Sequence, residues 1–452
     1  MKQAIDIEYF LSSKGLFQEI SFQTEKGLYK SESYIPGASV RSGETFIDAW
    51  DRLILQGHCS QPLARHLNPI RVVDLFCGCG GFTEGIKQAF NSAGFNVEIT
   101  AAVDIDESAL SLYTLNHSPL VSFSKDVNDL ARCVFRQNID NTLSLHDPSF
   151  QNIGIETLEI LMQGCDVLLA GPPCQGHSNL NNHSRRNDPR NNLYLAVATY
   201  AALLSPKVIA IENVSSVLKD RSGNVHKTHM LLESLGYSVH SVLVKGIEVG
   251  LPQTRNRHFT IAYNSEGINP RALMKSYSSY FLRPRSVSWA LQMPPTVCDL
   301  QNCFYTPSAP SKQNLERINW LHDMNVYDLP FDHRPVCHHE NHNYKSVYGR
   351  LCPDLPSGTI TTGFNSPGRG RFVHPSERRV ITACEASLIQ GFPTSYKFYT
   401  DGLMPSRNVH SKVIGDAVSP MMARAVGNLL AVQIASEFSS EDTNPDLLSV
   451  AA

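Results

Sequence analysis

Long hydrophobic runs are missing from this sequence. It has no segment of about 18 or more continuous apolar residues, the length that a membrane-spanning helix needs. The first ten residues, MKQAIDIEYF, carry neither the basic head nor the apolar run of a signal peptide. These absences argue against a membrane protein and a secreted protein, so we expect a soluble protein of the cytoplasm.

The sequence also lacks the cysteine spacing typical of secreted proteins, and it has no large net charge of either sign. The 11 cysteines are an odd number without the regular spacing of a disulfide framework, so reduced thiols are expected. The formal net charge of −3 argues neither for nor against nucleic acid, because a binding cleft needs only a local basic patch. No internal repeat is evident.

What is present is the composition of a globular protein. The 452 residues, 42% of them hydrophobic and 18% charged, fit about two or three domains. Short β-rich apolar runs followed by helical stretches predict a mostly parallel α/β sheet of seven strands, at residues 71–76, 99–104, 120–123, 166–171, 207–212, 238–244 and 257–263. Amphipathic patterns predict helices at residues 81–93, 107–116, 193–204, 226–235, 378–390 and 412–430.

The same patterns divide the chain into five expected segments. Residues 67–263 should form a Rossmann-like catalytic domain, and residues 375–440 should return to it. Between them, residues 264–374 lose the regular alternation and predict a second, smaller, irregular domain rich in Pro, Ser, Tyr, His and Arg. Residues 1–66 carry no chemical motif and are expected to be a structural extension, and residues 441–452 a flexible tail.

Chemistry-bearing motifs follow the predicted strands, at the sheet edge where ligands bind. The segment VVDLFCGCGGFTEGI, residues 72–86, runs from a strand through glycines into a helix, which suits close approach of the backbone to a ligand. It does not complete the G-x-G-x-x-G pattern, since Thr83 takes the last glycine's place. Asp104 ends the second strand, where an acid can bond ribose hydroxyls; the alternative is a helix cap shared with Asp106.

Two further strand ends carry a thiol and a carboxyl group. The turn GPPCQGHS projects Cys174 from a strand end made stiff by two prolines, which suits a nucleophile; a buried structural cysteine is the alternative. The strand KVIAIE ends in Glu212, which is either an acid at the same sheet edge or a surface cap.

Taken in order, these motifs resemble those of the DNA (cytosine-5)-methyltransferases. The series DLFCGCGG, VDID, GPPCQGHS, IENV, QTRNRHFTIA, RRVITACEASLIQGFP and IGDAVSP spans most of the chain in the order of that family. The resemblance implies methyl transfer from S-adenosylmethionine to C5 of a cytosine flipped out of double-stranded DNA. It implies the compact prokaryotic or viral type, a monomer associated with the nucleoid, and it allows a cognate restriction endonuclease as a functional partner.

The resemblance also implies roles for individual residues. Cys174 is the expected nucleophile, Glu212 the acid and Arg257 a clamp on the base, with Gln253 and Arg255 as support or as structural partners. The expected cofactor-binding residues are Phe76, Gly78, Gly80, Asp104, Ile105, Asp126, Pro173, Leu193 and Asp416. The expected DNA-binding residues are Arg185 and Arg186 in a loop over the DNA, and Arg369 and Arg371 in the recognition domain.

Alternative functions and a metal were weighed on the same residues. An RNA cytosine-C5 methyltransferase shares the motif order, and a non-catalytic DNA-binding relative would lack Cys174 or Glu212; a nicotinamide or flavin oxidoreductase would not explain PPCQ and ENV. No metal is expected. The candidate ligands are Cys337, His338, His339, His342 and Cys352, and their spacing is not that of a zinc finger.

One position departs from the family pattern. Asp416 stands in IGDAVSP where the family usually has Asn, at a position expected to face the amino-acid end of the cofactor. A carboxylate there would repel the cofactor's own carboxylate. We expect Asp416 to face the cofactor's ammonium group, or to cap the helix that begins near Pro420. A pocket adapted to a cofactor without that carboxylate is the third option.

Overall fold

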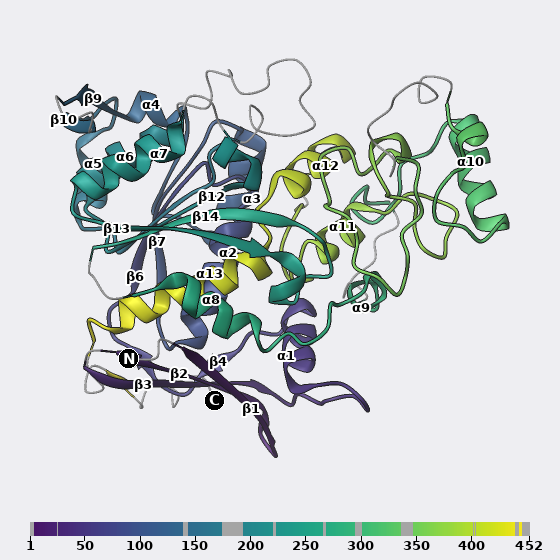
Figure 1. Cartoon of the computed structure of the whole chain (residues 1–452), viewed down its shortest axis with the longest axis horizontal. Helices are drawn as coiled ribbons and strands as arrows, with labels where there is room; N and C mark the ends of the chain where they lie inside the picture. The colour runs from purple at the N-terminus through teal and green to yellow at the C-terminus, as the bar shows by residue number, and fades with distance from the viewer. Residues whose placement is uncertain are drawn as a thin grey trace.

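The computed structural model describes residues 4–24, 26–138, 143–173, 193–219, 223–264, 268–293, 301–335, 347–400, 402, 404–438 and 443–444 (Figure 1). A seven-stranded sheet lies at its centre, in the order β13-β14-β12-β11-β6-β7-β8. The strands are β6 (Ile70–Leu75), β7 (Val97–Asp104), β8 (Val121–Ser124), β11 (Val167–Ala170), β12 (Val208–Val214), β13 (Ser238–Lys245) and β14 (Asn256–Tyr263). Only β14 runs antiparallel to its neighbours β12 and β13. The predicted fold class is confirmed, with each of the seven strands within two residues of its expected bounds.

Both faces of this sheet are covered by helices, which explains its continuous apolar strands. In β11, Val167 and Leu169 point into one core and Leu168 and Ala170 into the other, as the alternation of a strand requires. The first core includes α2 (Gly81–Ser92), α3 (Glu107–His117) and α13 (Pro420–Ala435). The second includes residues of α4 (Val127–Leu130), α5 (Ile155–Met162), α6 (Leu193–Leu204) and α7 (Asn224–Ser234).

Two of the predicted helices have different bounds. Residues 412–430 contain two helices rather than one, α12 (Arg407–Asp416) and α13, because Pro420 lacks a backbone N–H and begins a new helix at its first turn. The helix predicted at residues 378–390 is shorter, α11 (Ala383–Ile389), because Thr382 caps its N-terminus in a capping box with Glu385.

The N-terminal extension forms a sheet of its own along one side of the molecule (Figure 1). Its four antiparallel strands are β1 (Ile5–Ser12), β2 (Gly15–Thr24), β3 (Gly27–Pro36) and β4 (Gln61–Pro62), followed by β5 (Arg65–His66), which pairs with β15 (Thr443–Asn444). Helix α1 (Phe46–Leu55) connects β3 to β4 and supplies the buried Asp51. Asp51 pairs with Arg285 at 2.6 Å and with Arg424 of α13, so it joins the extension to two distant segments.

A hairpin occupies the long stretch between Asp126 and the GPPC turn. Its strands, β9 (Ala131–Gln137) and β10 (Leu143–Phe150), pair antiparallel and contact α6 and α7. The stretch therefore adds a layer over the helices and leaves the central sheet uninterrupted.

The remaining elements form a lobe with little regular structure, beside the central sheet (Figure 1). It contains α9 (Val287–Leu291), α10 (Lys312–Asp323) and the short turns η4 (Phe331–His333) and η6 (Pro367–Arg369). The preceding helix, α8 (Pro270–Ser278), packs on α13 and β1, and η2 (Ser215–Lys219) and η3 (Gly246–Val249) follow β12 and β13. Throughout the described ranges, we find no helix that is long and apolar enough to cross a membrane.

Candidate active site and cofactor cavity

The turn after β6 forms the floor of the site. Phe76 and Gly78 both have φ angles in the left-handed region, 55° and 54°, which bend the chain sharply between strand and helix. The amide of Cys77 donates to the carbonyl of Val103 at 3.1 Å, so the turn is fixed to the end of β7. A Cβ atom at Gly78 would point into open space, which leaves the backbone there accessible to a ligand.

A cavity of about 480 Å³ opens above this turn, at the carboxyl ends of the parallel strands. Most of the predicted site residues within the described part of the chain line it, namely Phe76, Gly78, Asp104, Ile105, Asp126, Pro173, Leu193, Glu212, Arg257 and Asp416. Gly80 is not among the lining residues. It begins α2 with a φ of 92°, and a Cβ atom there would collide with His117, so its role is to fit the helix start into a crowded space.

Asp104 connects two of the loops that surround the cavity. Its Oδ2 accepts a hydrogen bond from the amide of Gly78 and its Oδ1 from the amide of Asp106, both at 2.8 Å. Asp106, not Asp104, is the N-cap of α3, so the alternative of a shared cap is not what the structure contains. Burial raises the pKa of Asp104, and each carboxylate oxygen keeps a lone pair for a further donor such as a hydroxyl.

The outer part of the cavity is both apolar and acidic. The side chain of Ile105 is 72% exposed, although it is large and hydrophobic, and it forms part of the cavity wall. Asp126 caps α4, with its Oδ1 accepting from the amide of Asn128 at 2.9 Å, and it leaves its other oxygen for a ligand. An exposed apolar side chain and a carboxylate that line the same cavity suit a flat ring that carries an amino group, such as adenine.

Glu212 and Arg257 form an ion pair at the inner part of the cavity. They come from antiparallel neighbours, β12 and β14, in which Val214 lies opposite Arg257 and Glu212 opposite Phe259. The two side chains are therefore diagonal neighbours on one face, and Arg257 Nε lies 2.7 Å from Glu212 Oε1. Both side chains are nearly buried, with exposed fractions of 13% for Arg257 and 11% for Glu212.

The nucleophile predicted at Cys174 lies outside the described residues, as do Arg185 and Arg186. The turn that leads to it is described: Gly171, Pro172 and Pro173 follow β11 and line the cavity. Asn213 Nδ2 donates to the carbonyl of Pro172 at 3.2 Å, which ties this turn to the strand that carries Glu212. Asn213 was not predicted as a site residue, although the IENV motif that contains it could have identified it.

Gln253 and Arg255 support the site from behind and do not line the cavity. Gln253 Oε1 accepts from the amide of Ile360 at 3.0 Å, and Arg255 donates to the carbonyls of Ile360 and Ala417 at 3.1 and 2.8 Å. Both side chains are buried. These hydrogen bonds hold the irregular lobe and the segment after α12 against the catalytic strands.

Comparison with known proteins agrees with this arrangement. The profile of the family described as C-5 cytosine-specific DNA methylase matches residues 70–431. The chain belongs to that family. It is 36% identical over 351 residues to the Type II methyltransferase M1.BsuMI of Bacillus subtilis (strain 168), and this alignment covers 77% of each chain. It is 25% identical over 401 residues to the Type II methyltransferase M.DdeI of Desulfomicrobium norvegicum, and this alignment covers 80% of this chain and 88% of the relative.

The protein is thus a DNA (cytosine-5)-methyltransferase, and its cofactor is S-adenosylmethionine. Among solved structures it is similar to a candidate DNA modification methyltransferase encoded within an E. coli prophage. The TM-score is 0.50 at 22% identity, over 80% of this chain and 98% of the other. That likeness shows the fold, and the matched profile also indicates that the N-terminal sheet, which precedes residue 70, lies outside the family's common part.

In this methyltransferase Asp416 ends α12 and faces the cavity beside a lysine. Lys412 Nζ lies 2.6 Å from Asp106 Oδ2 and 3.9 Å from Asp416 Oδ2. The cap of α13 is Ser419 rather than Asp416, so the capping role expected as one option for Asp416 is wrong. Lys412 also lines the cavity, although no sequence motif had pointed to it as a site residue.

The two arginines predicted to bind DNA in the recognition lobe differ in their surroundings. Arg371 pairs with Asp328 at 2.6 Å and donates to the carbonyls of Tyr327 and Arg350. Arg369 is exposed, makes no side-chain hydrogen bond or ion pair with the other described residues, and lines a polar hollow. The other residues that line this hollow are Thr362, Gly363, Asn365, Ser366 and Asn408.

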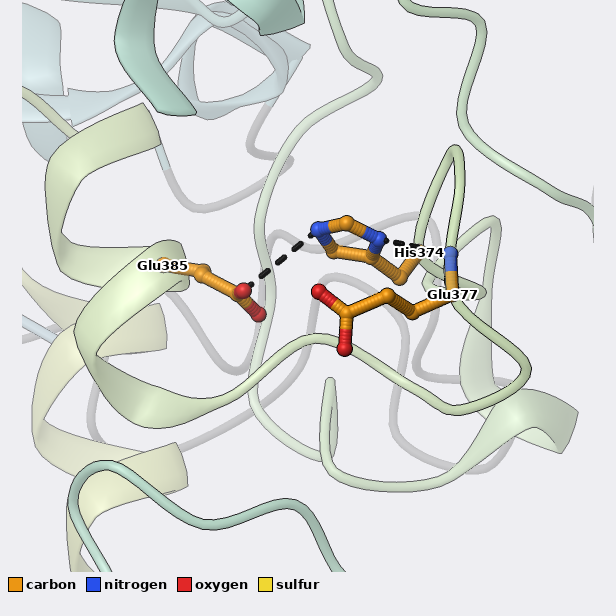
Figure 2. Close-up of side chains that lie close together, drawn as sticks. All are labelled: His374, Glu377 and Glu385. Atoms are coloured by element: carbon orange, nitrogen blue, oxygen red, sulfur yellow. Dashed lines mark hydrogen bonds and ion pairs between the residues drawn. The ribbon is translucent and has the colours of Figure 1, made fainter. Parts of the chain in front are cut away.

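One group of possible metal ligands occurs in the described part of the methyltransferase. Figure 2 shows His374, Glu377 and Glu385 facing one another, with His374 Nε2 at 3.4 Å from Glu385 Oε1. Arg379 pairs with both carboxylates, and His374 Nδ1 accepts from the amide of Glu377 at 3.0 Å. Because these atoms already have partners, we interpret the group as a link between the lobe and α11. Of the cysteines and histidines weighed for zinc, only Cys352 lies in the described ranges.

Proposed function

We propose that this methyltransferase transfers a methyl group to C5 of a cytosine flipped out of a specific site in double-stranded DNA, with Cys174 as the covalent nucleophile. The observation that carries the proposal is the Glu212–Arg257 pair on the same cavity as Asp104 and Asp126. A single cavity thus offers an arginine and a glutamate for the cytosine ring, and the carboxylates of Asp104 and Asp126 for the adenosine of the cofactor. Cys174 follows Gly171, Pro172 and Pro173 in the sequence, and these three residues line the same cavity.

The chemistry requires a nucleophile because C5 of cytosine does not attack a methyl donor readily. The thiolate of Cys174 adds to C6, and the electron pair of the C5–C6 double bond becomes available at C5. The bound cofactor supplies an electrophilic methyl group on its sulfonium. After the methyl group reaches C5, the proton on C5 leaves and the bond between C6 and sulfur breaks, which restores both the aromatic ring and the thiolate.

Glu212 and Arg257 act on the pyrimidine ring in this proposal. Addition at C6 places negative charge on the ring, and a proton shared between Glu212 and N3 stabilises it. Arg257 then turns one of its N–H donors to the carbonyl oxygen of the base. The pair at 2.7 Å supports this assignment, because Arg257 holds the Glu212 carboxyl in a fixed orientation before the base arrives.

The cavity residues fit the cofactor. Asp104 would accept hydrogen bonds from the ribose hydroxyls, Asp126 would accept one from the adenine amino group, and Ile105 would cover the adenine face. The open backbone at Gly78 leaves room for the chain between ribose and amino acid. Phe76, Pro173 and Leu193 would exclude water from the reacting atoms.

DNA would bind along the lobe and the edge of the cavity. Arg369, with an exposed guanidinium in a polar hollow, is the described residue best suited to a DNA backbone phosphate. Arg185 and Arg186 are proposed to contact phosphates from the loop after Cys174, and Arg371 remains a predicted contact. Flipping the base costs a few kcal/mol, which these contacts would offset. The same proposal includes a monomer that works on chromosomal DNA in the cytoplasm, with a cognate restriction endonuclease as a functional partner.

Sequencing of DNA from cells that express the chain tests this function. We expect 5-methylcytosine at one short recurrent sequence, and none there in cells that express Glu212→Gln. Methylation of adenine, methylation confined to RNA, or no methylation from an expressed and folded chain would contradict the proposal.

A further inference from the structure

Four charged side chains stand at one rim of the cofactor cavity. Asp104 and Asp106 follow β7, and Lys412 and Asp416 lie one helical turn apart on α12; all four line the cavity. Lys412 bridges the two elements, at 2.6 Å from Asp106 and 3.9 Å from Asp416. The side chains of Lys412 and Asp416 are half exposed, at 52% and 50%, so both keep a surface for a ligand.

Helix α12 is well placed to hold such a pair in position. The carbonyls of Val413 and Ile414 accept hydrogen bonds from Cys79 Sγ and Gln390 Nε2, and Ser411 Oγ accepts from the amide of Gly363. Asp106 Oδ1 meanwhile caps α3, so the oxygen that holds Lys412 belongs to a residue that is itself fixed. The ammonium of Lys412 is therefore held at the cavity by its own helix, α12, and by Asp106 at the start of α3.

The amino-acid end of the cofactor needs charged partners, and Lys125, the other lysine that lines the cavity, is next to Asp126 in the chain and so belongs to the end proposed for adenine. The amino-acid end carries one ammonium and one carboxylate. In the proposed function Asp104 and Asp126 take the ribose and adenine, and Glu212 and Arg257 take the base. Among the described lining residues, Lys412 and Asp416 offer a basic and an acidic group that lie 3.9 Å apart.

We propose that Lys412 and Asp416 together recognise this zwitterion: Lys412 binds the cofactor's carboxylate, and Asp416 binds its ammonium. This inference rests on the proposed use of the cavity for S-adenosylmethionine. It explains how Asp is tolerated where the family usually has Asn, because Lys412 offsets the added negative charge. A lysine ammonium has three N–H donors, and the one used by Asp106 leaves others for the ligand.

The charge state of Lys412 agrees with this role. Burial lowers the pKa of Lys412, but the hydrogen bond to Asp106 and the charges of Asp106 and Asp416 outweigh that effect and raise the pKa. Lys412 is therefore a cation at neutral pH. The competing explanation is that Lys412 only tethers α12 to α3. In that case, replacing Lys412 should weaken the binding of ligands with and without the carboxylate equally.

Calorimetric titration with three ligands separates the two explanations. S-adenosylmethionine carries both groups, decarboxylated S-adenosylmethionine keeps only the ammonium, and methylthioadenosine has neither. For Lys412→Met we expect binding of S-adenosylmethionine to weaken about tenfold or more, with no loss for the other two ligands. For Asp416→Asn we expect a severalfold loss for both ammonium-bearing ligands and none for methylthioadenosine.

Lys245→Met is the matched control, because Lys245 is also paired with a carboxylate, at 2.7 Å from Glu248, but on the surface away from the cavity lining. Equal losses of all three ligands in Lys412→Met would overturn the proposal in favour of a tether, and so would unchanged or tighter binding of S-adenosylmethionine. Methylation of DNA by the wild type, measured in parallel, reports on the proposed function separately. A wild type that methylates DNA while the variants bind normally would refute only the zwitterion site.

Discussion

Arg257 Nε lies 2.7 Å from Glu212 Oε1, and this contact joins two motifs that are 45 positions apart in the sequence. The antiparallel pairing of β12 and β14 places both side chains on one face of the sheet. The two opposite charges offset each other at this distance. A cytosine that enters the cavity must therefore compete for this pair, which makes its two members sensitive points for mutation.

For Glu212→Gln we expect kcat to fall about 100-fold or more, since the amide keeps the shape of the side chain but cannot exchange the proton that N3 needs. DNA affinity should change little. The measurement is steady-state methylation of duplex DNA together with a binding titration. Glu248→Gln, which removes a surface ion pair with Lys245 of the same 2.7 Å length, is the control and should leave kcat unchanged. An unchanged kcat in Glu212→Gln would remove Glu212 from the reaction.

Arg369→Ala and Arg371→Ala should differ in their effect on thermal stability. Arg369→Ala should weaken DNA binding for all sequences and reduce the slope of log affinity against log salt by about one, with no change in thermal stability. Arg371→Ala should lower the melting temperature, because it removes the pair with Asp328 and two hydrogen bonds to backbone carbonyls. DNA binding at several salt concentrations and thermal melting, measured for both variants, test these predictions. Equal salt slopes in wild type and Arg369→Ala would exclude Arg369 as a phosphate contact.

Asp74 should make the stability of the protein depend on pH. Burial raises the pKa of Asp74 to about 7, and the nearby charge of Asp104 adds to the effect. A folded-state pKa above the unfolded value means that this contribution to stability is fully present below about pH 4 and is lost as the pH rises through 7. Asp74→Asn cannot ionise, and its amide oxygen can still accept from Thr83, which donates to Asp74 at 2.6 Å.

The free energies of unfolding of wild type and Asp74→Asn should therefore diverge with pH. Relative to its value at pH 4, the difference should shift in favour of the variant by up to about 4 kcal/mol at pH 8. Denaturant titrations at several pH values measure it. Two parallel curves across this range would show that Asp74 ionises normally in the folded protein.

The seven strands were predictable because each is a short apolar run that ends at a motif or a turn. The hairpin of β9 and β10 was not predicted, since the apolar alternation of Ala131, Cys133 and Phe135 is short and is interrupted by Val134, and Val134 and Phe135 are both exposed. The hydrophobic pattern of residues 412–430 did not show the break between α12 and α13, but Pro420 indicated the start of a helix there, and α13 begins at that residue.

The site divides in the same way. Glu212 and Asp104 could be predicted because they stand at strand ends, and Arg257 because its motif resembles that of the family. The contribution of Lys412 could not, since it depends on Asp106, which lies 306 positions earlier in the chain and meets it only after folding. The link from Asn213 to Pro172 likewise exists only once β11 and β12 are neighbours.

Covalent trapping on DNA tests the central claim most directly. Incubation of the protein with S-adenosylmethionine and a duplex that carries 5-fluorocytosine at the methylated position should yield a complex that survives denaturation, because fluorine at C5 cannot leave as a proton does. Mass spectrometry of the digested complex should find the methylated base attached to the peptide that contains Cys174, and Cys174→Ser should bind the duplex but form no complex. An active wild-type enzyme that forms no adduct, or forms it through another residue, would contradict the account.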